Sequence, residues 1–181
     1  MTFTETRLPG VWLVDGEVFH DNRGLFALAW APEPFAARGL ETGIAQASLA
    51  VNRRRGTIRG LHYQSAPFEE VKFIRAIRGV VYDVAVDVRP DSPTYRRWLG
   101  VELSAENRRM LYVPRGFAHG YQTLSDDAEV LYFVSAPYSP AHQQGIRWND
   151  PAIGIDWPLG PPTVISDRDR QFPDFQPAPV R

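Results

Sequence analysis

At 181 residues, 44% of them hydrophobic and 23% charged, the chain is long enough to bury a core, and we expect one globular domain spanning residues 1–181. The formal net charge of −1 and the dispersed Lys and Arg residues give no basic excess that would indicate a nucleic-acid partner. The sequence contains no cysteine, which excludes disulfides, zinc–thiolate sites and thiol nucleophiles.

The N-terminal segment, Met1–Gly10, lacks the apolar stretch of a signal peptide. No run in the sequence approaches the roughly 18 consecutive apolar residues of a membrane-spanning helix. These features predict a cytoplasmic protein with no membrane partner.

Short segments between turns provide the predicted elements, in chain order. The first is a helix over Ala31–Gly39, with proline near its start and glycine at its end. Strands follow over Glu69–Gly79 and Val80–Val88, and the second alternates cleanly between two faces. Two more strands are predicted over Arg108–Pro114 and Glu129–Ala136. Many short strands, separated by turns that use 14 glycines and 16 prolines, favour an antiparallel sandwich or barrel.

The C-terminal third, from Ser135 onward, is richer in proline and in turns than the rest of the chain. It also carries large apolar side chains that need burial, namely Trp148, Ile153, Ile155 and Trp157. We therefore expect this segment to wrap over the sheets.

Two histidines stand out, His62 in RGTIRGLHYQ (Arg55–Gln64) and His119 in PRGFAHGYQ (Pro114–Gln122). The second segment has the Pro-x-Gly-x-x-His spacing of the second cupin motif, but the His-x-His pair of the first motif is missing. Because a metal site usually needs three or four protein ligands, we expect no bound metal.

Cationic side chains lie on or beside the strand of His62, at Arg59, Lys72 and Arg75. Such side chains inside a small barrel are costly unless an anion is bound, and arginine pairs well with phosphate. The pattern predicts an anionic ligand such as a diphosphate. Arg59 and His62 are three residues apart, so a regular strand would point them to opposite faces. A bulge at Gly60 would let both point inward.

Seven segments spread over nearly the whole chain form a specific series: DNRGLF (21–26), GTIRGLHYQ (56–64), VKFIRAIRGVVYDVAVDVRPDSPTY (71–95), VPRGFAHGYQTL (113–124), EVLYFVSAPYSP (129–140), GIRWNDPAIGIDWP (145–158) and SDRD (166–169). Together they resemble the dTDP-4-dehydrorhamnose 3,5-epimerase family. The resemblance implies a mainly β, cupin-type antiparallel jelly roll with a few short helices, forming a homodimer without metal or other cofactor. It implies epimerisation at C3 and/or C5 of a nucleoside-diphosphate 4-keto-6-deoxyhexose through an enolate.

The same resemblance implies three catalytic residues. His62 is the base, Asp169 supports its far ring nitrogen, and Tyr132 returns a proton from the opposite face. The other implied contacts are to the nucleotide-sugar substrate. Lys72 stabilises the enolate oxygen, His119 contacts the sugar, Arg59 meets the diphosphate, Arg23 reaches it from the partner subunit, Tyr138 stacks on the base, and Arg168, Gln46 and Gln143 complete the substrate site.

Several positions depart from the family pattern. Leu28 and Gln143 replace glutamates, and Ala47 and Leu49 fall where a base-reading Gln-x-Asn pair is expected when counted back from His62. A one-residue insertion would instead bring Gln46 and Ser48 to those places. The nucleotide, the sugar and the number of inverted carbons therefore stay open. Two alternatives remain beside the epimerase: a metal-dependent cupin enzyme and a non-catalytic nucleotide-sugar binding module.

Overall fold

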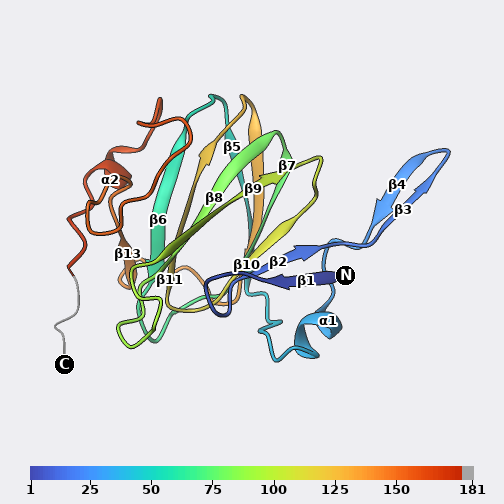
Figure 1. Ribbon diagram of the computed structural model, residues 1–181, viewed down its shortest axis with the longest axis horizontal. Coiled ribbons are helices and arrows are strands. Elements are labelled where there is room, and N and C mark those ends of the chain that lie inside the picture. Colours follow the sequence, from blue (N-terminus) through green and yellow to red (C-terminus); the bar gives the residue numbers. More distant parts are fainter. Residues whose placement is uncertain (177–181) are drawn as a thin grey trace.

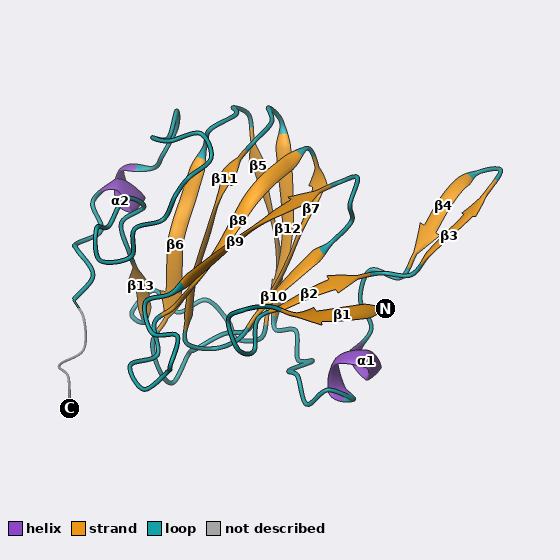
Figure 2. Ribbon diagram, viewed as in Figure 1, coloured by secondary structure: helices purple, strands orange, loops and turns teal. Residues whose placement is uncertain are grey.

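Two facing antiparallel sheets form the body of the molecule in a computed structural model that describes residues 1–176 (Figure 1, Figure 2). The six-stranded sheet has the order β1 (Thr2–Glu5), β2 (Trp12–Asp15), β10 (Met110–Val113), β7 (Lys72–Arg78), β12 (Ala128–Val134) and β5 (Gln46–Asn52). The five-stranded sheet has the order β13 (Gln143–Gly145), β6 (Ile58–Gln64), β11 (Phe117–Thr123), β8 (Val80–Asp87) and β9 (Trp98–Ser104). From β5 to β8 and from β9 to β12, successive strands alternate between the sheets, which is the connectivity of a jelly roll. The predicted fold class is confirmed.

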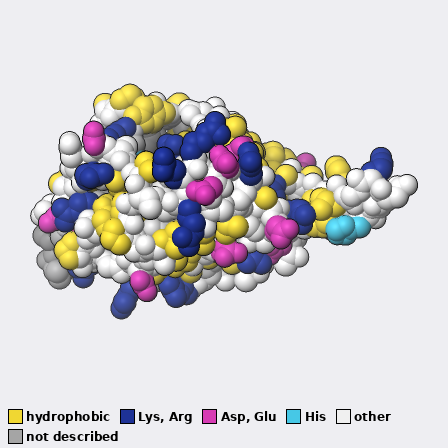
Figure 3. Space-filling view, turned by 90° about the horizontal axis from the view of Figure 1, so that it is seen from above, with side chains coloured by type: hydrophobic (Ala, Val, Ile, Leu, Met, Phe, Trp, Pro, Cys, Tyr) yellow, Lys and Arg dark blue, Asp and Glu magenta, His cyan; other side chains and the backbone are white. Residues whose placement is uncertain are grey.

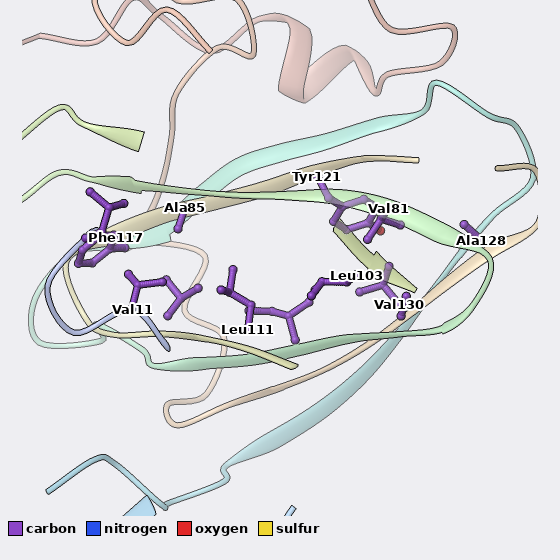
Figure 4. Packing of buried hydrophobic residues seen from close by; sticks show 13 residues of the cluster. Val11, Val81, Ala85, Leu103, Leu111, Phe117, Tyr121, Ala128 and Val130 are labelled. Atoms are coloured by element: carbon purple, nitrogen blue, oxygen red, sulfur yellow. The ribbon is translucent and has the colours of Figure 1, made fainter. Parts of the chain in front are cut away.

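The core between the sheets is built from alternating inward side chains (Figure 4). Leu111 and Val130 from the six-stranded sheet meet Val81, Ala85 and Leu103 from the five-stranded sheet, and all five are fully buried. The predicted alternation of Val80–Val88 is confirmed, because Val84 and Val86 point instead to the outer face of their sheet.

The C-terminal segment covers that outer face, as expected. Ile153 and Trp157 are buried against Ile58, Val84 and Val86. Near its end the segment forms α2 (Asp167–Arg170), which lies beside β6 (Figure 1). This wrapping brings residues near the end of the chain next to the strand that carries His62.

The predicted helix is present but short. It runs over Pro32–Ala36 as α1 and buries Phe35 against Phe73 and Tyr112 on part of the outer face of the six-stranded sheet. Each predicted strand is also present, as β7, β8, β10 and β12, with ends that differ from the predicted ones by at most three residues. Neither described helix has the length and apolar character needed to span a bilayer.

A separate two-stranded hairpin, β3 (Val18–Asp21) and β4 (Gly24–Ala27), projects from the body like an arm (Figure 1, Figure 3). Its side chains Phe19 and Phe26 are 55% and 69% exposed. The sequence patterns did not predict this hairpin. On the face of the body seen in Figure 3, positively charged side chains are interspersed with Asp and Glu.

Candidate active site

A cavity of about 660 Å³ opens between the two sheets and is lined by β5, β6, β7, β11 and β12, with the C-terminal segment along one side. Ten of the eleven predicted site residues line it: Gln46, Arg59, His62, Lys72, His119, Tyr132, Tyr138, Gln143, Arg168 and Asp169. The remaining one, Arg23, lies on the projecting hairpin. Residues spread over more than half of the chain thus meet in one place.

His62 and Asp169 form a histidine–carboxylate dyad. Nε2 of His62 lies 2.7 Å from Oδ1 of Asp169, and the backbone N–H of Gly60 donates to Oδ2 at 3.0 Å. Burial acts to raise the pKa of Asp169, but the hydrogen bonds from His62 and Gly60 outweigh it and hold that pKa below its ordinary value. An ionised Asp169 fixes Nε2 as the protonated nitrogen of neutral His62, which leaves Nδ1 free to accept a proton.

The position of Asp169 follows from a helix cap. Ser166 is the N-cap of α2, and its hydroxyl accepts a hydrogen bond from the backbone N–H of Asp169 at 3.1 Å. This cap fixes the first turn of a four-residue helix, so the buried Asp169 points toward β6 while Asp167 stays exposed.

The expected irregularity at Gly60 is confirmed. Opposite β11, His62 pairs with His119 and Arg59 pairs with Tyr121, so three residue steps on β6 match two on its partner. Gly60 has a φ of +118°, and a Cβ there would lie 2.6 Å from the Cα of Gly120. The extra residue reverses the side-chain phase, and both Arg59 and His62 line the cavity.

His119 belongs to a second dyad on β11 and β8. Its Nε2 lies 2.8 Å from Oδ1 of Asp83, which is fully buried. Burial raises the pKa of Asp83 above its ordinary value, although His119 opposes the shift. The partnership of His119 with Asp83 was not predicted, although the alternation of β8 placed Asp83 on one face.

The six-stranded sheet supplies the opposite wall of the cavity. Tyr132 on β12 and Lys72 on β7 line it from this side, whereas His62 and His119 line it from the five-stranded sheet. Lys72 is 7% exposed and forms an ion pair with Glu70, a cavity residue that the sequence patterns did not single out. A ligand in the cavity therefore meets a dyad on one side and a tyrosine and a cation on the other.

The remaining predicted residues line the cavity from β5, from β13, from α2 and from the loop that carries Tyr138. Arg168 on α2 approaches the hydroxyl of Tyr138, with Nη1 at 3.5 Å, and Tyr138 is 51% exposed. Oε1 of Gln143 is buried with no hydrogen-bond partner among residues 1–176. Nε2 of Gln46 donates to the hydroxyl of Ser48 at 3.0 Å.

The phase of β5 decides between the two alignments of this strand. Leu49 and Val51 are exposed on the outer face, while Asn52 is buried and Ala50 lines the cavity. Neither Ala47 nor Leu49 lines the cavity, whereas Gln46 does, so the phase of β5 is that of the alignment with a one-residue insertion. Asn52 accepts a hydrogen bond from Nε of Arg59 at 2.7 Å, a contact that the sequence did not reveal.

Arg75 and Leu28 lie outside the cavity. Arg75 was expected to add positive charge near His62, but β7 alternates so that Arg75 lies on the outer face and donates to the backbone oxygen of Arg108. Leu28 follows the hairpin, is 41% exposed and does not line the cavity.

Within residues 1–176 no group of three or more His, Asp or Glu side chains is arranged to hold a metal ion. Both cavity histidines direct Nε2 at a carboxylate. The polar groups present are suited to moving protons and binding an anion. A histidine–carboxylate dyad facing a tyrosine and a buried lysine, inside a β-sandwich, defines a proton-transfer enzyme of the cupin type.

Comparison with known proteins gives the family. Residues 5–177 match the family model described as dTDP-4-dehydrorhamnose 3,5-epimerase. A protein of that name from Sinorhizobium fredii is 42% identical over 99% of this chain and 92% of its own length. The chain belongs to the dTDP-4-dehydrorhamnose 3,5-epimerase family.

Solved structures agree. The epimerase of Bacillus anthracis, with TDP and pyrophosphate bound, superposes with a TM-score of 0.93 at 39% identity, covering 96% of this chain and 99% of that one. ChmJ from Streptomyces bikiniensis, a 3′-monoepimerase in complex with dTDP-quinovose, superposes with a TM-score of 0.87 at 35% identity, covering 93% and 85%.

Proposed function

We propose that the protein epimerises C3 and/or C5 of a nucleoside-diphosphate 4-keto-6-deoxyhexose, with dTDP-4-dehydro-6-deoxyglucose as the test substrate. The observation that carries the proposal is a pair of proton-transfer groups that line opposite walls of the cavity. The His62–Asp169 dyad lies on the side of the five-stranded sheet, and Tyr132 lies on the side of the six-stranded sheet. Inverting a carbon by proton exchange requires a base on one face and an acid on the other.

The chemistry begins at a carbon next to the C4 ketone, whose proton is weakly acidic. Nδ1 of His62 takes that proton, and the ionised Asp169 stabilises the imidazolium that forms. The electron pair of the C–H bond moves to the C4 oxygen as an enolate, beside the ammonium group of Lys72. Tyr132 then donates its hydroxyl proton to the opposite face of the carbon, the ketone re-forms, and exchange with water restores His62 and Tyr132.

Binding of the substrate follows from the remaining cavity residues. Arg59 pairs with the diphosphate, because its guanidinium matches phosphate oxygens, and His119 hydrogen-bonds the sugar. Tyr138 stacks on the nucleobase, with Arg168, Gln46 and Gln143 beside it. Arg23 contributes from the partner subunit.

We further infer a homodimer. The outer face of the six-stranded sheet exposes Leu49, Val51 and Ile77, and the hairpin exposes Phe19 and Phe26. Apolar side chains exposed on one face of a sheet and on a projecting arm fit a protein–protein interface. In a symmetric dimer the arm carrying Arg23 reaches a neighbouring body, because its own cavity does not include that residue.

Deuterium exchange from solvent into dTDP-4-dehydro-6-deoxyglucose tests the reaction and separates the two proton-transfer roles. The native enzyme is expected to incorporate deuterium at C3, at C5, or at both, and exchange at one carbon identifies a monoepimerase. His62→Ala is expected to lose exchange by about a thousandfold, since removal of a base costs on the order of 10²–10⁴. Tyr132→Phe is expected to keep exchange while losing inversion.

The same experiment addresses the two alternatives. Tight binding without any exchange would mark a nucleotide-sugar binding module and overturn the proposal. Loss of exchange after treatment with a chelator, restored by added metal, would mark a metal-dependent cupin enzyme. Undiminished exchange in His62→Ala would show that another group is the base.

A further inference from the structure

Lys72 is the single lysine of the chain, and all other members of its 20 Lys and Arg residues are arginines. Arginine stays charged in nearly any environment, whereas a buried lysine shifts its pKa readily. The one lysine ammonium group in the protein lies in the cavity wall, at the start of β7. Its charge state therefore depends on its surroundings.

Those surroundings contain one anionic contact. Glu70 accepts a hydrogen bond from Nζ of Lys72, and the two side chains, Lys72 and Glu70, are only 9% and 7% exposed. The residues opposite Lys72 on the flanking strands are Val113 and Val134, which are apolar. The second oxygen of Glu70, Oε2, is buried with no hydrogen-bond partner among the described residues.

The other titratable groups of the cavity are already engaged or carry no charge opposite to that of Lys72. Asp169 pairs with His62, Asp83 pairs with His119, and the charged arginines cannot stabilise a second cation. The remaining groups that line the cavity are the tyrosines and cations Tyr63, Tyr121, Tyr132, Tyr138, Arg59 and Arg168. Glu70 is thus the carboxylate in this part of the chain that acts directly on Lys72.

Burial lowers the pKa of Lys72 below its ordinary value, while the charge and hydrogen bond of Glu70 oppose that shift. A neutral amine stabilises a developing enolate far less than an ammonium ion does. A fixed carboxylate next to Lys72 therefore matters for any role of this lysine as a cation.

We propose that Glu70 is a positioning residue, which holds the side chain of Lys72 in place and keeps it in the ammonium form at neutral pH. The proposal deepens the proposed function, because the ammonium group is the one assigned to the C4 oxygen of the sugar. Glu70 acts through Lys72 and needs no contact with the substrate.

The single lysine makes a direct test possible. Protein labelled with ¹³C,¹⁵N-lysine gives one lysine side-chain signal, so NMR follows the titration of Lys72 in the absence of substrate. In Glu70→Gln the midpoint is expected to fall by about 1–3 pH units, the usual effect of an adjacent opposite charge. Glu70→Asp, which retains the charge, is expected to restore most of the native midpoint.

Glu69→Gln is the matched control, since Glu69 undergoes the same change one residue earlier and does not line the cavity. Its midpoint is expected to equal that of the native protein. An equal midpoint in Glu70→Gln, with the fold shown intact by circular dichroism, would overturn the proposal.

Kinetics link the titration to catalysis. The alkaline limb of the kcat profile of Glu70→Gln is expected to move down in pH together with the NMR midpoint of Lys72. At pH 8, kcat then falls about tenfold for every pH unit by which that midpoint lies below 8, with KM nearly unchanged. An alkaline limb that does not follow the lysine signal would refute the catalytic part. The NMR result stands apart from activity: an inactive native enzyme refutes the proposed function, and an unchanged midpoint refutes the role of Glu70.

Discussion

At the scale of single residues, the two histidines of the cavity differ in the carboxylate that each one meets. Asp169 receives hydrogen bonds from His62 and from a backbone N–H, and its pKa lies below its ordinary value. Asp83 is fully buried, has an Oδ2 without a partner among the described residues and has a raised pKa. A firmly ionised carboxylate stabilises an imidazolium, so the environment favours His62 over His119 as the base.

Asp169→Asn tests this distinction. An amide at position 169 is neutral, and its N–H group donates to Nε2 of His62, which moves the ring proton to Nδ1 and blocks the base. We expect kcat to fall about 10³–10⁴-fold with little change in KM, the magnitude known for loss of the carboxylate in a catalytic triad. Steady-state kinetics and deuterium exchange measure it.

The control is Asp167→Asn, a change of the same chemistry on an exposed face of α2. It is expected to retain native kcat. A small loss in Asp169→Asn, similar to that of the control, would mean that His62 works without carboxylate support.

At the scale of the element, the bulge in β6 decides which side chains reach the ligand. Gly60 and Gly120 face each other across β6 and β11, and a Cβ on either would meet the other strand's backbone at 2.6 Å. The close approach lets one extra residue fit into β6. A regular strand would keep His62 in the cavity only by turning Arg59 away from it.

Gly60→Ala is expected to destabilise the protein by about 2–4 kcal/mol, combining a positive φ with a backbone clash. Catalysis should fall as well, because Arg59 and His62 move together. Gly154→Ala is the comparison: Gly154 has a φ of +65° but no atom within 4 Å of its would-be Cβ, so only about 1 kcal/mol is expected. Urea unfolding measures both, and equal losses would show that the contact with β11 is unimportant.

Elements also explain what the sequence could and could not predict. Strand alternation assigned the two faces of β8 correctly, and the glycine after Arg59 indicated the bulge. It is harder to predict from sequence which side chains of a strand face the cavity when the ends of the strand are uncertain. Arg75 was expected near His62 but lies outside the cavity, and the register of β5 is seen only in its pairing with β12. The predicted strand Glu69–Gly79 included Glu70, but β7 begins only at Lys72, and the ion pair between Glu70 and Lys72 is revealed by the three-dimensional structure.

At the scale of the whole molecule, the two outer faces of the sandwich are treated differently. The C-terminal segment covers the five-stranded sheet and delivers Asp169 to the cavity, whereas α1 covers only part of the six-stranded sheet. The uncovered part exposes Leu49, Val51 and Ile77, and the hairpin extends away from its own body (Figure 1). Both features are accounted for together by a symmetric partner, which would cover the sheet and receive the arm.

Mixing two variants tests whether each site uses both subunits. His62→Ala removes the base, and Arg23→Ala removes the arm's cation, which is expected to lower kcat/KM about tenfold or more. A heterodimer of the two variants contains one site with both native residues only if the arm crosses between subunits. After co-refolding, about a quarter of native activity should return, since half of the dimers are mixed and each has one intact site.

Mixing His62→Ala with Asp169→Asn is the control, because both changes lie in the body of one subunit and no intact site can form. Light scattering establishes the dimer, and activity no greater than the mean of the parents would show that Arg23 does not act across the interface.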